Sequence, residues 1–282
     1  MTTADLDAYR GMNYDVAEAI APTWERRRAQ IEEVATPLRE WLTRELAPQP
    51  GETILELAGG TGDTGFDAAA ALGEHGKLIS SDFSPAMLDA ARRRGAERGV
   101  ANVDYRLIDA EQIGLEDDSV DGVICRFGYM LIADPAAALA ETRRVLRPGG
   151  RLVLGVWGPP ERNPFFTAIV IGLVEGGHMS PPDPTGPGIF SMASEERTTA
   201  LLEGAGFTDI RIEHLTFHFE IPDIEEYLSV IADTAGPVAL VLRRLSAPDR
   251  EVVREHAEAA LEGFRGEHGY RIPGLVLAAG AS

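Results

Sequence analysis

The stretch Thr53–Gly65, TILELAGGTGDTG, decides the fold that this sequence predicts. Its first five residues are mostly apolar or β-branched and indicate a strand. Gly59, Gly60 and Gly62 follow, and glycines readily take the positive φ of a tight turn, where the backbone can approach a bound molecule. A helix beginning at about Asp63 would present free N–H groups to an anion. We therefore expect a strand, a turn and a helix around a nucleotide-like cofactor.

Strands and helices alternate beyond this stretch, which is typical of a mostly parallel sheet with helices on both faces, an α/β fold. The expected helices cover about 63–72, 85–98 and 135–146, and the expected strands cover 77–81, 103–108, 120–125 and 151–157. Farther along we expect helices at 165–175, 194–204, 223–235 and 248–265, and strands at 208–220 and 272–278.

The segments around this core predict decorations of a single domain. Residues 1–22 are polar and are expected to be irregular, and Thr36-Pro37 is expected to end one helix and begin the next. We expect a helical cap over 1–47 and the main domain over 48–282, with insertions at about 158–193 and 222–268. The Gly/Pro-rich loop Gly176–Phe190 is either a surface connector or a substrate lid.

Composition narrows the classes of partner. The formal net charge of −19 makes a nucleic-acid substrate unexpected, because such binding depends on basic surfaces. Cys125 is the single cysteine, which excludes an internal disulfide and fits a reducing cytoplasm. The longest nearly apolar run, Phe165–Val174, is too short to span a bilayer. We expect a cytoplasmic protein with a small-molecule substrate and no integral membrane association, and the sequence predicts no oligomeric state.

Polar residues stand where the strands are expected to end. A carboxylate at the second strand end, Asp82, can accept both ribose hydroxyls, and one at the third, Asp109, can accept an adenine amine. The run Gly60–Gly65 also matches G-x-G-x-x-G, so a nicotinamide dinucleotide is an alternative cofactor. A short-chain reductase needs a Tyr-xxx-Lys pair, but the single lysine, Lys77, follows Gly73 at that spacing. Other dehydrogenase types remain open.

Four motifs in order resemble those of class I S-adenosylmethionine (SAM) methyltransferases, especially the ubiquinone/menaquinone C-methyltransferase group. They are ELAGGTGD at 56–63, DFSPAML at 82–88, Asp109-Ala110 followed by VDGV at 120–123, and LRPGGRL at 146–152. The resemblance covers about residues 50–157 and implies a Rossmann-like, seven-stranded, mostly parallel sheet of order 3-2-1-4-5-7-6. Strand seven would be antiparallel, at Ile272–Ala278.

The resemblance also implies SAM as the cofactor and direct displacement of its methyl group by an acceptor atom. The glycine turn would wrap the methionine part, Asp82 the ribose, Phe83 and Met87 the adenine face, and Asp109-Ala110 the adenine edge. The expected cofactor residues are Glu56, Ala58, Gly59, Gly60, Thr61, Gly62, Asp82, Phe83, Met87, Asp109, Ala110 and Arg126.

The sequence says less about the methyl acceptor than about the cofactor. The chain departs from the quinone enzymes after Phe127-Gly128 and in WGPPERNPFF, which argues against a quinone. We expect C- or O-methylation of a small aromatic or apolar metabolite. The expected acceptor pocket contains Tyr14, Phe127, Tyr129, Trp157, His178 and Phe190, although core packing explains any one of these aromatics equally well.

Histidines are the candidates for a general base, and the sequence pattern favours none of them over the others. His178, His214 and His218 are named for this role, and ordinary surface or core positions account for each of them. No metal site is expected. A SAM-binding sensor or partner subunit without transferase activity is the alternative from another functional class.

Overall fold

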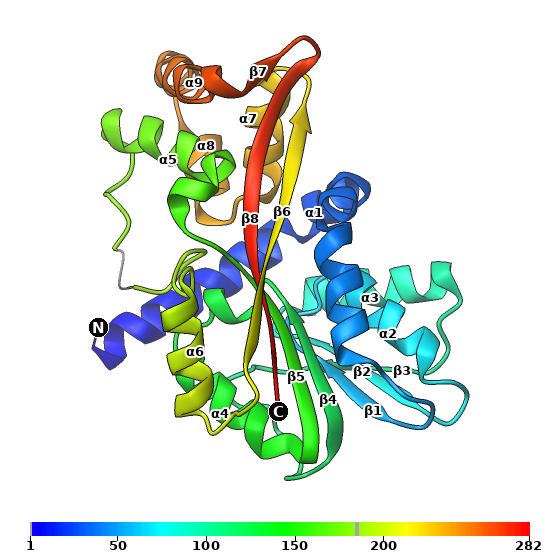
Figure 1. Cartoon of the computed structure of the whole chain (residues 1–282). Coiled ribbons are helices and arrows are strands. Elements are labelled where there is room, and N and C mark those ends of the chain that lie inside the picture. Colours follow the sequence, from blue (N-terminus) through cyan, green and yellow to red (C-terminus); the bar gives the residue numbers. More distant parts are fainter. Residues whose placement is uncertain (1, 184–185) are drawn as a thin grey trace.

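A computed structural model describes residues 2–183 and 186–282, so Pro184 and Thr185 of the expected Gly/Pro loop lie outside the described residues. The sheet has the strand order β3-β2-β1-β4-β5-β8-β6 (Figure 1). The strands β1 to β5 are parallel, and β8 runs antiparallel to both β5 and β6. The predicted order and the antiparallel seventh strand are confirmed, and a two-residue strand, β7, is added. Their bounds are β1 Thr53–Glu56, β2 Lys77–Asp82, β3 Val103–Leu107, β4 Val120–Arg126, β5 Leu146–Trp157, β6 Arg211–Ile221, β7 Arg265–Gly266 and β8 Gly269–Ala281.

Helices cover both faces of the sheet. In Figure 1, α2, α3 and the C-terminal part of α1 lie on one side, and α4 and α6 lie on the other. The helices are α1 Thr3–Leu46, α2 Asp63–Ala71, α3 Pro85–Arg98, α4 Pro135–Val145, α5 Pro164–Glu175, α6 Glu195–Gly204, α7 Ile224–Thr234, α8 Pro237–Arg244 and α9 Ala247–Leu261. No helix of the described residues is long and apolar enough to cross a membrane.

The strands β6 and β8 extend beyond the rest of the sheet. Pairing of β5 with β8 ends at Trp157 and Val276, whereas pairing of β6 with β8 continues to Ile221 and Tyr270. The helices α5, α7, α8 and α9 gather around this two-stranded extension, at the top of Figure 1. They enclose a second apolar core, which includes Phe165, Leu173, Tyr227, Ile231, Leu261 and Ile272.

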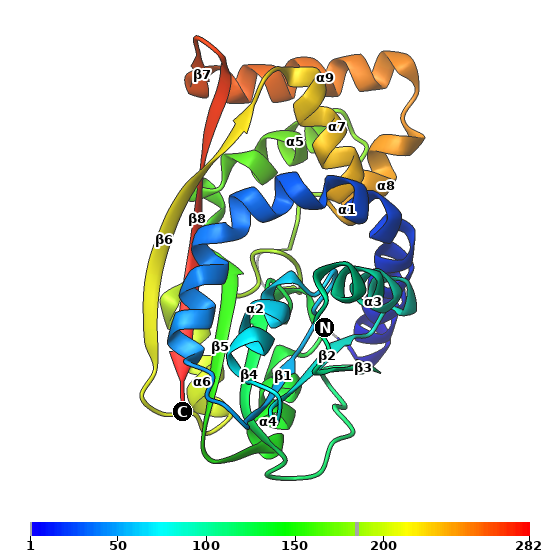
Figure 2. The ribbon, with the colours of Figure 1, turned by 90° about the vertical axis from the view of Figure 1, so that its right-hand side faces the viewer.

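The N-terminal region differs from the prediction. Residues 3–46 form one helix, so the irregular structure expected over 1–22 is wrong for residues 3–22, and the expected break at Thr36-Pro37 is also wrong. Both Pro22 and Pro37 lie inside α1, where each removes a backbone hydrogen bond and favours a kink. Figure 2 shows α1 as an arch. The helix tolerates the prolines because buried side chains along it, such as Val16 and Trp41, pack on α3 and on the sheet.

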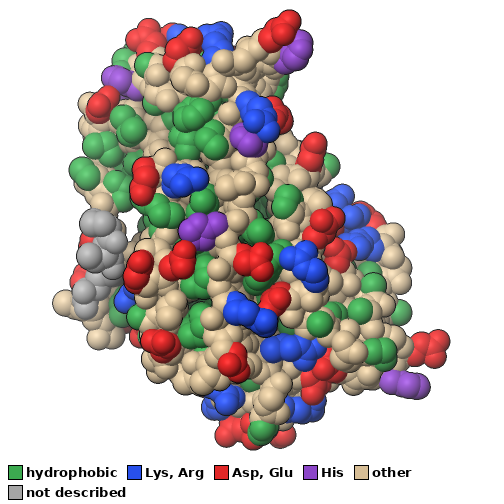
Figure 3. Space-filling view, in the orientation of Figure 1, with side chains coloured by type: hydrophobic (Ala, Val, Ile, Leu, Met, Phe, Trp, Pro, Cys, Tyr) green, Lys and Arg blue, Asp and Glu red, His purple; other side chains and the backbone are tan. Residues whose placement is uncertain are grey.

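Two smaller differences concern the other elements. No helix was predicted between 235 and 248, whereas α8 begins at Pro237, directly after Gly236, and a Gly-Pro pair is typical of a turn. The segment Arg147–Gly150 was expected to stop a helix ahead of the fifth strand, but it lies within β5. The register of β5 with β4 shifts between Val120 and Gly122 to accommodate it. On the face shown in Figure 3, acidic and basic side chains are interspersed.

Candidate cofactor and acceptor site

The glycine turn leaves one side of its backbone open. Gly60 and Gly62 have φ of +55° and +82°, and a Cβ at Gly60 would meet no atom within 4 Å. A Cβ at Gly59 or Gly65 would instead collide with the side chain of Glu56, at 2.7 and 2.5 Å. Ala58 also takes a positive φ of +51°, and such strain tends to cluster at functional sites. A Cβ at Gly62 would lie 2.6 Å from the Phe66 ring, so the turn is packed against Glu56 and Phe66 and is open at Gly60.

Glu56 supports this turn from the protein interior. Its Oε1 accepts a hydrogen bond from the N–H of Gly65 and its Oε2 accepts one from Ser80 Oγ, each at 2.6 Å. Burial raises the pKa of this carboxyl to about 7. Both oxygens are thus engaged by α2 and β2, so Glu56 fixes the shape of the turn.

Asp82 links the glycine turn to the second strand end. Its Oδ2 accepts from the Gly60 N–H and its Oδ1 accepts from the Ser84 N–H, each at 2.9 Å. Burial raises the pKa of this carboxyl above its ordinary value. Each carboxylate oxygen has a second lone pair, so Asp82 can still accept from a ligand. The neighbouring Phe83 is 36% exposed.

Asp109 and Ala110 follow the carboxyl end of β3, the strand next to β2. Asp109 lies exposed just past β3, and its Oδ1 accepts from the Glu111 N–H at 2.9 Å, while Ala110 is half-buried. Since β1, β2 and β3 are neighbours, the glycine turn, Asp82 and Asp109 stand at three adjacent carboxyl ends. The structure brings these predicted cofactor residues together along one edge.

The N-terminal half of α1 crosses above this edge. Arg10 binds Glu111 beyond β3 at 2.5 Å, and the side-chain amide of Asn13 donates to the Leu131 carbonyl beyond β4 at 2.6 Å. In the sheet order, β1 lies between β3 and β4, so these two contacts flank the carboxyl end of β1. They anchor α1 across the carboxyl edge of the sheet.

Contacts with α3 continue this cover. Glu18 Oε1 accepts from Ser84 Oγ at 2.5 Å and from the Ala86 N–H at 3.0 Å. The ring of Tyr14 meets Phe83 edge to face, with centroids 6.2 Å apart. Met87, expected at the adenine face, is buried against Val16, Ile20 and Ala21 of α1. Tyr14 therefore lies at the cofactor edge rather than among the other expected acceptor residues.

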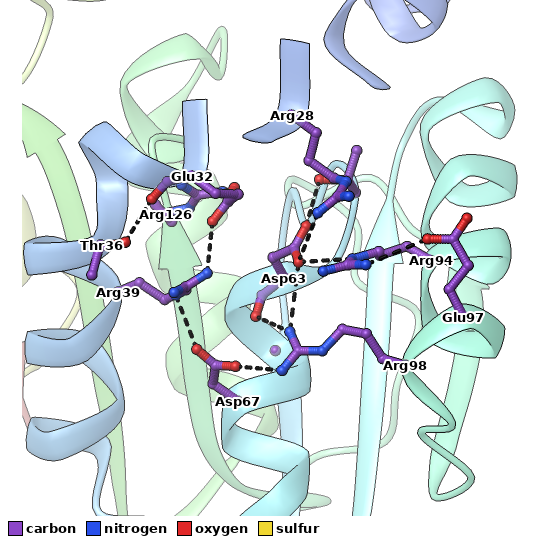
Figure 4. Close-up of polar contacts among 12 residues, drawn as sticks. Arg28, Glu32, Thr36, Arg39, Asp63, Asp67, Arg94, Glu97, Arg98 and Arg126 are labelled. Carbon is purple, nitrogen blue, oxygen red and sulfur yellow. Dashed lines mark hydrogen bonds and ion pairs between the residues drawn. The ribbon is translucent and has the colours of Figure 1, made fainter. Parts of the chain in front are cut away.

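Ion pairs join the middle of α1 to α2 and to β4, and further ion pairs join α2 to α3 (Figure 4). The buried Asp63 lies 3.0 Å from Arg94, 3.5 Å from Arg98 and 3.7 Å from Arg28, and it also accepts from Thr61 Oγ1 at 3.2 Å. This network fixes the start of α2 immediately after the glycine turn.

A second part of the network involves the end of β4. Glu32 accepts from Arg126 Nη2 at 2.6 Å and from Arg39 Nη1 at 3.0 Å. Among the described residues, the buried Arg126 Nη1 has no hydrogen-bond partner. An unpaired buried donor of a charged group is costly, so an oxygen of water or of a ligand would stabilise this nitrogen.

Aromatic rings gather beyond β4 and β5. Phe127 stacks on Trp157 with centroids 4.3 Å apart and an interplanar angle of 10°, and φ of Phe127 is +60°. Phe166 of α5 lies 4.7 Å from the Trp157 ring, and Phe217 and Phe219 of β6 lie at 5.7 and 6.3 Å. We call these five residues the aromatic wall. Phe190 joins it through Phe166, at 6.5 Å.

Three residues of the aromatic wall, Phe166, Phe217 and Phe219, were not predicted from the sequence. Phe217 and Phe219 alternate in a strand that was predicted, so period-two spacing places them on one face and could have found them. Gly274 lies opposite Phe217, where a Cβ would come within 2.7 Å of its ring. Phe166 lies at the start of a predicted helix, but only the tertiary structure shows which way it faces.

Other predicted residues lie elsewhere. Tyr129 is fully buried, and its hydroxyl pairs with Thr142 Oγ1 at 2.6 Å inside the main core. His178 lies 3.8 Å from Asp249 at the start of α9. His214 pairs with Glu195 at 2.6 Å, and both side chains are about half exposed. The structure does not bring Tyr129, His178 or His214 to the aromatic wall. His218 pairs with Pro273 in the sheet, on the strand face opposite Phe217 and Phe219.

Two solved structures share the fold of this chain. A putative methyltransferase from Bacillus halodurans C-125 aligns with a TM-score of 0.57 at 21% identity, over 86% of this chain and 97% of that chain. The YcgJ protein from Bacillus subtilis aligns with a TM-score of 0.56 at 18% identity, over 87% of this chain and 97% of that chain. At these identities the similarity shows the fold alone.

Sequence comparisons identify the family. Residues 34–165 match the model of the ubiE/COQ5 methyltransferase family. A demethylmenaquinone methyltransferase of Clavibacter sepedonicus is 32% identical over 232 residues, which cover 77% of this chain and 90% of that relative. A ubiquinone/menaquinone biosynthesis C-methyltransferase of Teredinibacter turnerae is 34% identical over 116 residues, covering 41% of this chain and 47% of that relative. The chain therefore belongs to the ubiE/COQ5 methyltransferase family and is a SAM-dependent methyltransferase.

Proposed function

We propose that this enzyme methylates, at carbon or oxygen, a small aromatic or quinone-type ring that lies against the aromatic wall. The observation that carries the proposal is the Phe127–Trp157 stack beyond β4 and β5. These strands directly follow β1, which carries the glycine turn, in the sheet order. Aromatic side chains favour flat apolar ligands through area burial and ring stacking.

The donor side of the proposal rests on the strand-end residues. The open backbone at Gly60 would hold the methionine part of SAM, with Asp82 at the ribose and Asp109 at the adenine. When bound, SAM supplies a methyl group on a positively charged sulfur. The chain itself orients the two reactants and excludes water through α1, whose N-terminal half covers the edge.

Two observations bear on the class of acceptor: the name of a relative and the sequence of one segment of this chain. The relative from Clavibacter sepedonicus is named for a demethylated menaquinone, which favours a quinone-type ring. The segment WGPPERNPFF, where this chain departs from the quinone enzymes, contains Phe166 of the aromatic wall. We therefore propose a flat ring acceptor whose substituents differ from those of the quinone precursors.

We also propose that different segments of the chain contact the cofactor and the acceptor. Residues 1–47 would cover the cofactor, while the insertions at about 158–193 and 222–268 would shape the acceptor side. The acceptor would be a small molecule of the cytoplasm rather than a nucleic acid.

Calorimetry of SAM binding followed by methyl transfer to a panel of ring compounds tests this function. The panel contains a demethylmenaquinone with a short side chain, simple hydroquinones and phenols, and aliphatic alcohols as controls. We expect SAM binding and transfer to at least one ring compound but not to the alcohols. Transfer to alcohols in preference to rings would contradict the acceptor class, and SAM binding without any transfer would favour a sensor.

A further inference from the structure

The last turn of α7 is bonded to α1 directly after Pro22. Thr23 Oγ1 lies 2.5 Å from the Asp233 carbonyl oxygen, and Trp24 Nε1 donates to the Thr234 carbonyl at 3.2 Å. Carbonyl groups in the last turn of a helix lack partners within that helix, so these bonds complete α7 as well as hold α1. The two helices are therefore fixed to each other at this point.

Two successive arginines of α1 bond to different parts of the molecule. Arg27 pairs with Glu226 at 2.5 Å and with Asp233 at 2.9 Å, both on α7, and its side chain is only 21% exposed. Arg28 lies 3.7 Å from Asp63, at the start of α2 directly after the glycine turn. The middle of α1 is thus attached to the acceptor-side helices through Arg27 and to the donor side through Arg28.

A small apolar cluster joins the N-terminal half of α1, residues 3–21, to both sides. Its buried members are Val16, Ile20 and Ala21 of α1 and Met87 of α3, and Leu240 of α8 packs against them. In Figure 2, α3 lies below the arch of α1, and α7 and α8 lie above it. One cluster therefore contains a residue expected at the adenine face of the cofactor and a residue of the acceptor-side helices.

Packed rings lead from α7 to the aromatic wall. Tyr227 of α7 is fully buried, and its hydroxyl donates to the Phe165 carbonyl at 2.7 Å. The Phe165 ring stacks on Phe219 of the aromatic wall, with centroids 3.8 Å apart, and it meets Phe166 edge to face at 5.2 Å. Because a close-packed interior transmits displacement, a change in the position of α7 would reach the aromatic wall.

We propose that α1 couples the two sites, so that binding of SAM at the donor edge orders α7, α8 and the aromatic wall before the acceptor binds. This inference rests on the proposed function and adds regulation of its site. Residues 3–21 take two positions in it, seated on the carboxyl edge or lifted from it about Pro22, where the helix lacks a backbone hydrogen bond. An adenine against Phe83 and Met87 favours the seated position, because it adds contacts to residues that α1 covers. The seated position closes the apolar cluster around Leu240 and so stabilises α8 and α7.

Amide hydrogen exchange measured by mass spectrometry tests this coupling with S-adenosylhomocysteine as the only ligand. The quantity compared is the exchange rate of residues 224–244 with and without the ligand, in the absence of any acceptor. We expect exchange there to slow about fivefold or more, the lower end of the usual coupling between two sites, together with exchange in residues 3–21. Because the expected cofactor residues include none from α7 or α8, slower exchange in these helices reports transmission from the donor edge.

Two variants interrupt the coupling at separate points. Arg27→Gln removes the ion pairs with Glu226 and Asp233, and Leu240→Ala withdraws α8 from the apolar cluster. In each variant the ligand should bind within about tenfold of the parent affinity but slow the exchange of residues 224–244 by less than about twofold. Arg27→Lys keeps the charge and should retain part of the effect. Thermal unfolding identifies a variant that does not fold, and either folded variant suffices for the test.

Arg254→Gln is the matched control, because Arg254 pairs with Glu251 and Glu258 of its own helix, α9. It should respond to the ligand as the parent does. Two results would overturn the coupling: slower exchange in the parent that is confined to residues 3–21 and the strand ends, and undiminished slowing of residues 224–244 in the folded variants. No binding of S-adenosylhomocysteine would reject the donor site together with the coupling. Slowing that is present in the parent and lost in the variants would support the coupling even where the panel shows no methyl transfer, which would reject the proposed function alone.

Discussion

Asp82 Oδ2 accepts a 2.9 Å hydrogen bond from the Gly60 N–H, so the carboxylate at the end of β2 holds the turn that follows β1. The other oxygen accepts from the Ser84 N–H at the start of α3. One side chain thus sets the distance between the two segments expected to contact the methionine and ribose parts of SAM.

Replacing this side chain should weaken cofactor binding. We expect Asp82→Ala to reduce SAM affinity by about 1.5–3 kcal/mol, the range for hydrogen bonds to a charged group. Asp82→Asn retains one acceptor oxygen and should lose less. Calorimetric titration with SAM measures both variants, and thermal unfolding controls for misfolding. Equal SAM affinity in Asp82→Ala and the parent would remove Asp82 from the cofactor site.

Glu56 predicts a pH dependence of stability. Its pKa is about 7 in the folded protein, because of burial, against an ordinary value of 4.5. Between these values the folded state holds the extra proton, so the free energy of unfolding should fall as pH rises from about 4.5 to about 7 and then level off. Urea unfolding at several pH values measures this decrease. In Glu56→Gln, which cannot titrate at this position, the decrease in the free energy of unfolding should be smaller by up to about 3 kcal/mol. Parallel pH profiles for the two proteins would show that Glu56 does not titrate in this range.

The aromatic wall predicts a separation of acceptor binding from donor binding. Trp157→Leu should raise the acceptor KM about three- to tenfold, because the stacked ring is lost, with SAM affinity within about twofold. The matched control is Tyr129→Phe, which removes only the hydroxyl bonded to Thr142. It should leave the KM unchanged and lower stability by about 1 kcal/mol. A raised KM in Tyr129→Phe would return Tyr129 to the acceptor pocket.

The N-terminal half of α1 lies over the carboxyl edge of the sheet, so removing part of it should lower the turnover rate. Deleting residues 2–14 removes the Arg10 and Asn13 contacts but leaves Val16 and Ile20 packed on Met87. Turnover should fall at least about tenfold, and by a larger factor than SAM affinity, because water enters the site. Single-turnover kinetics and calorimetry measure the two quantities. Methylation at the parent rate by the shortened protein would show that other elements close the site.

The sequence predicted that the glycine turn, Asp82 and Asp109 lie at strand ends, because local chemistry determines these positions. Gly59, Gly60 and Gly62 specify a turn by their own conformational freedom, and Asp82 and Asp109 each follow a short apolar run. The parallel topology then places these positions on one edge. Glu56 was named as a cofactor residue, but its contacts with Gly65 and Ser80 depend on tertiary packing that no local pattern reveals.

The sequence predicted less where distant segments decide the structure. Pro22 and Pro37 argue against a continuous helix by local rules, and only the contacts of α1 with α3, α7 and the sheet outweigh them. The ion pair of Glu32 with Arg126 joins residues 94 positions apart. Candidate bases such as His214 were chosen by residue type, which says nothing of the direction in which a side chain points.

The insertion of β8 between β5 and β6 also has a consequence for the order of assembly during synthesis. Within the described part of the chain, the strand β6 pairs with β8 alone, and β8 follows it by nearly fifty residues of chain. A ribosome therefore releases Phe217 and Phe219 well before the strand that will hold them beside Trp157. Such distant pairing is slow to form, because loop closure precedes any gain from contacts. The donor edge can fold early, whereas the acceptor side waits for residues 269–281.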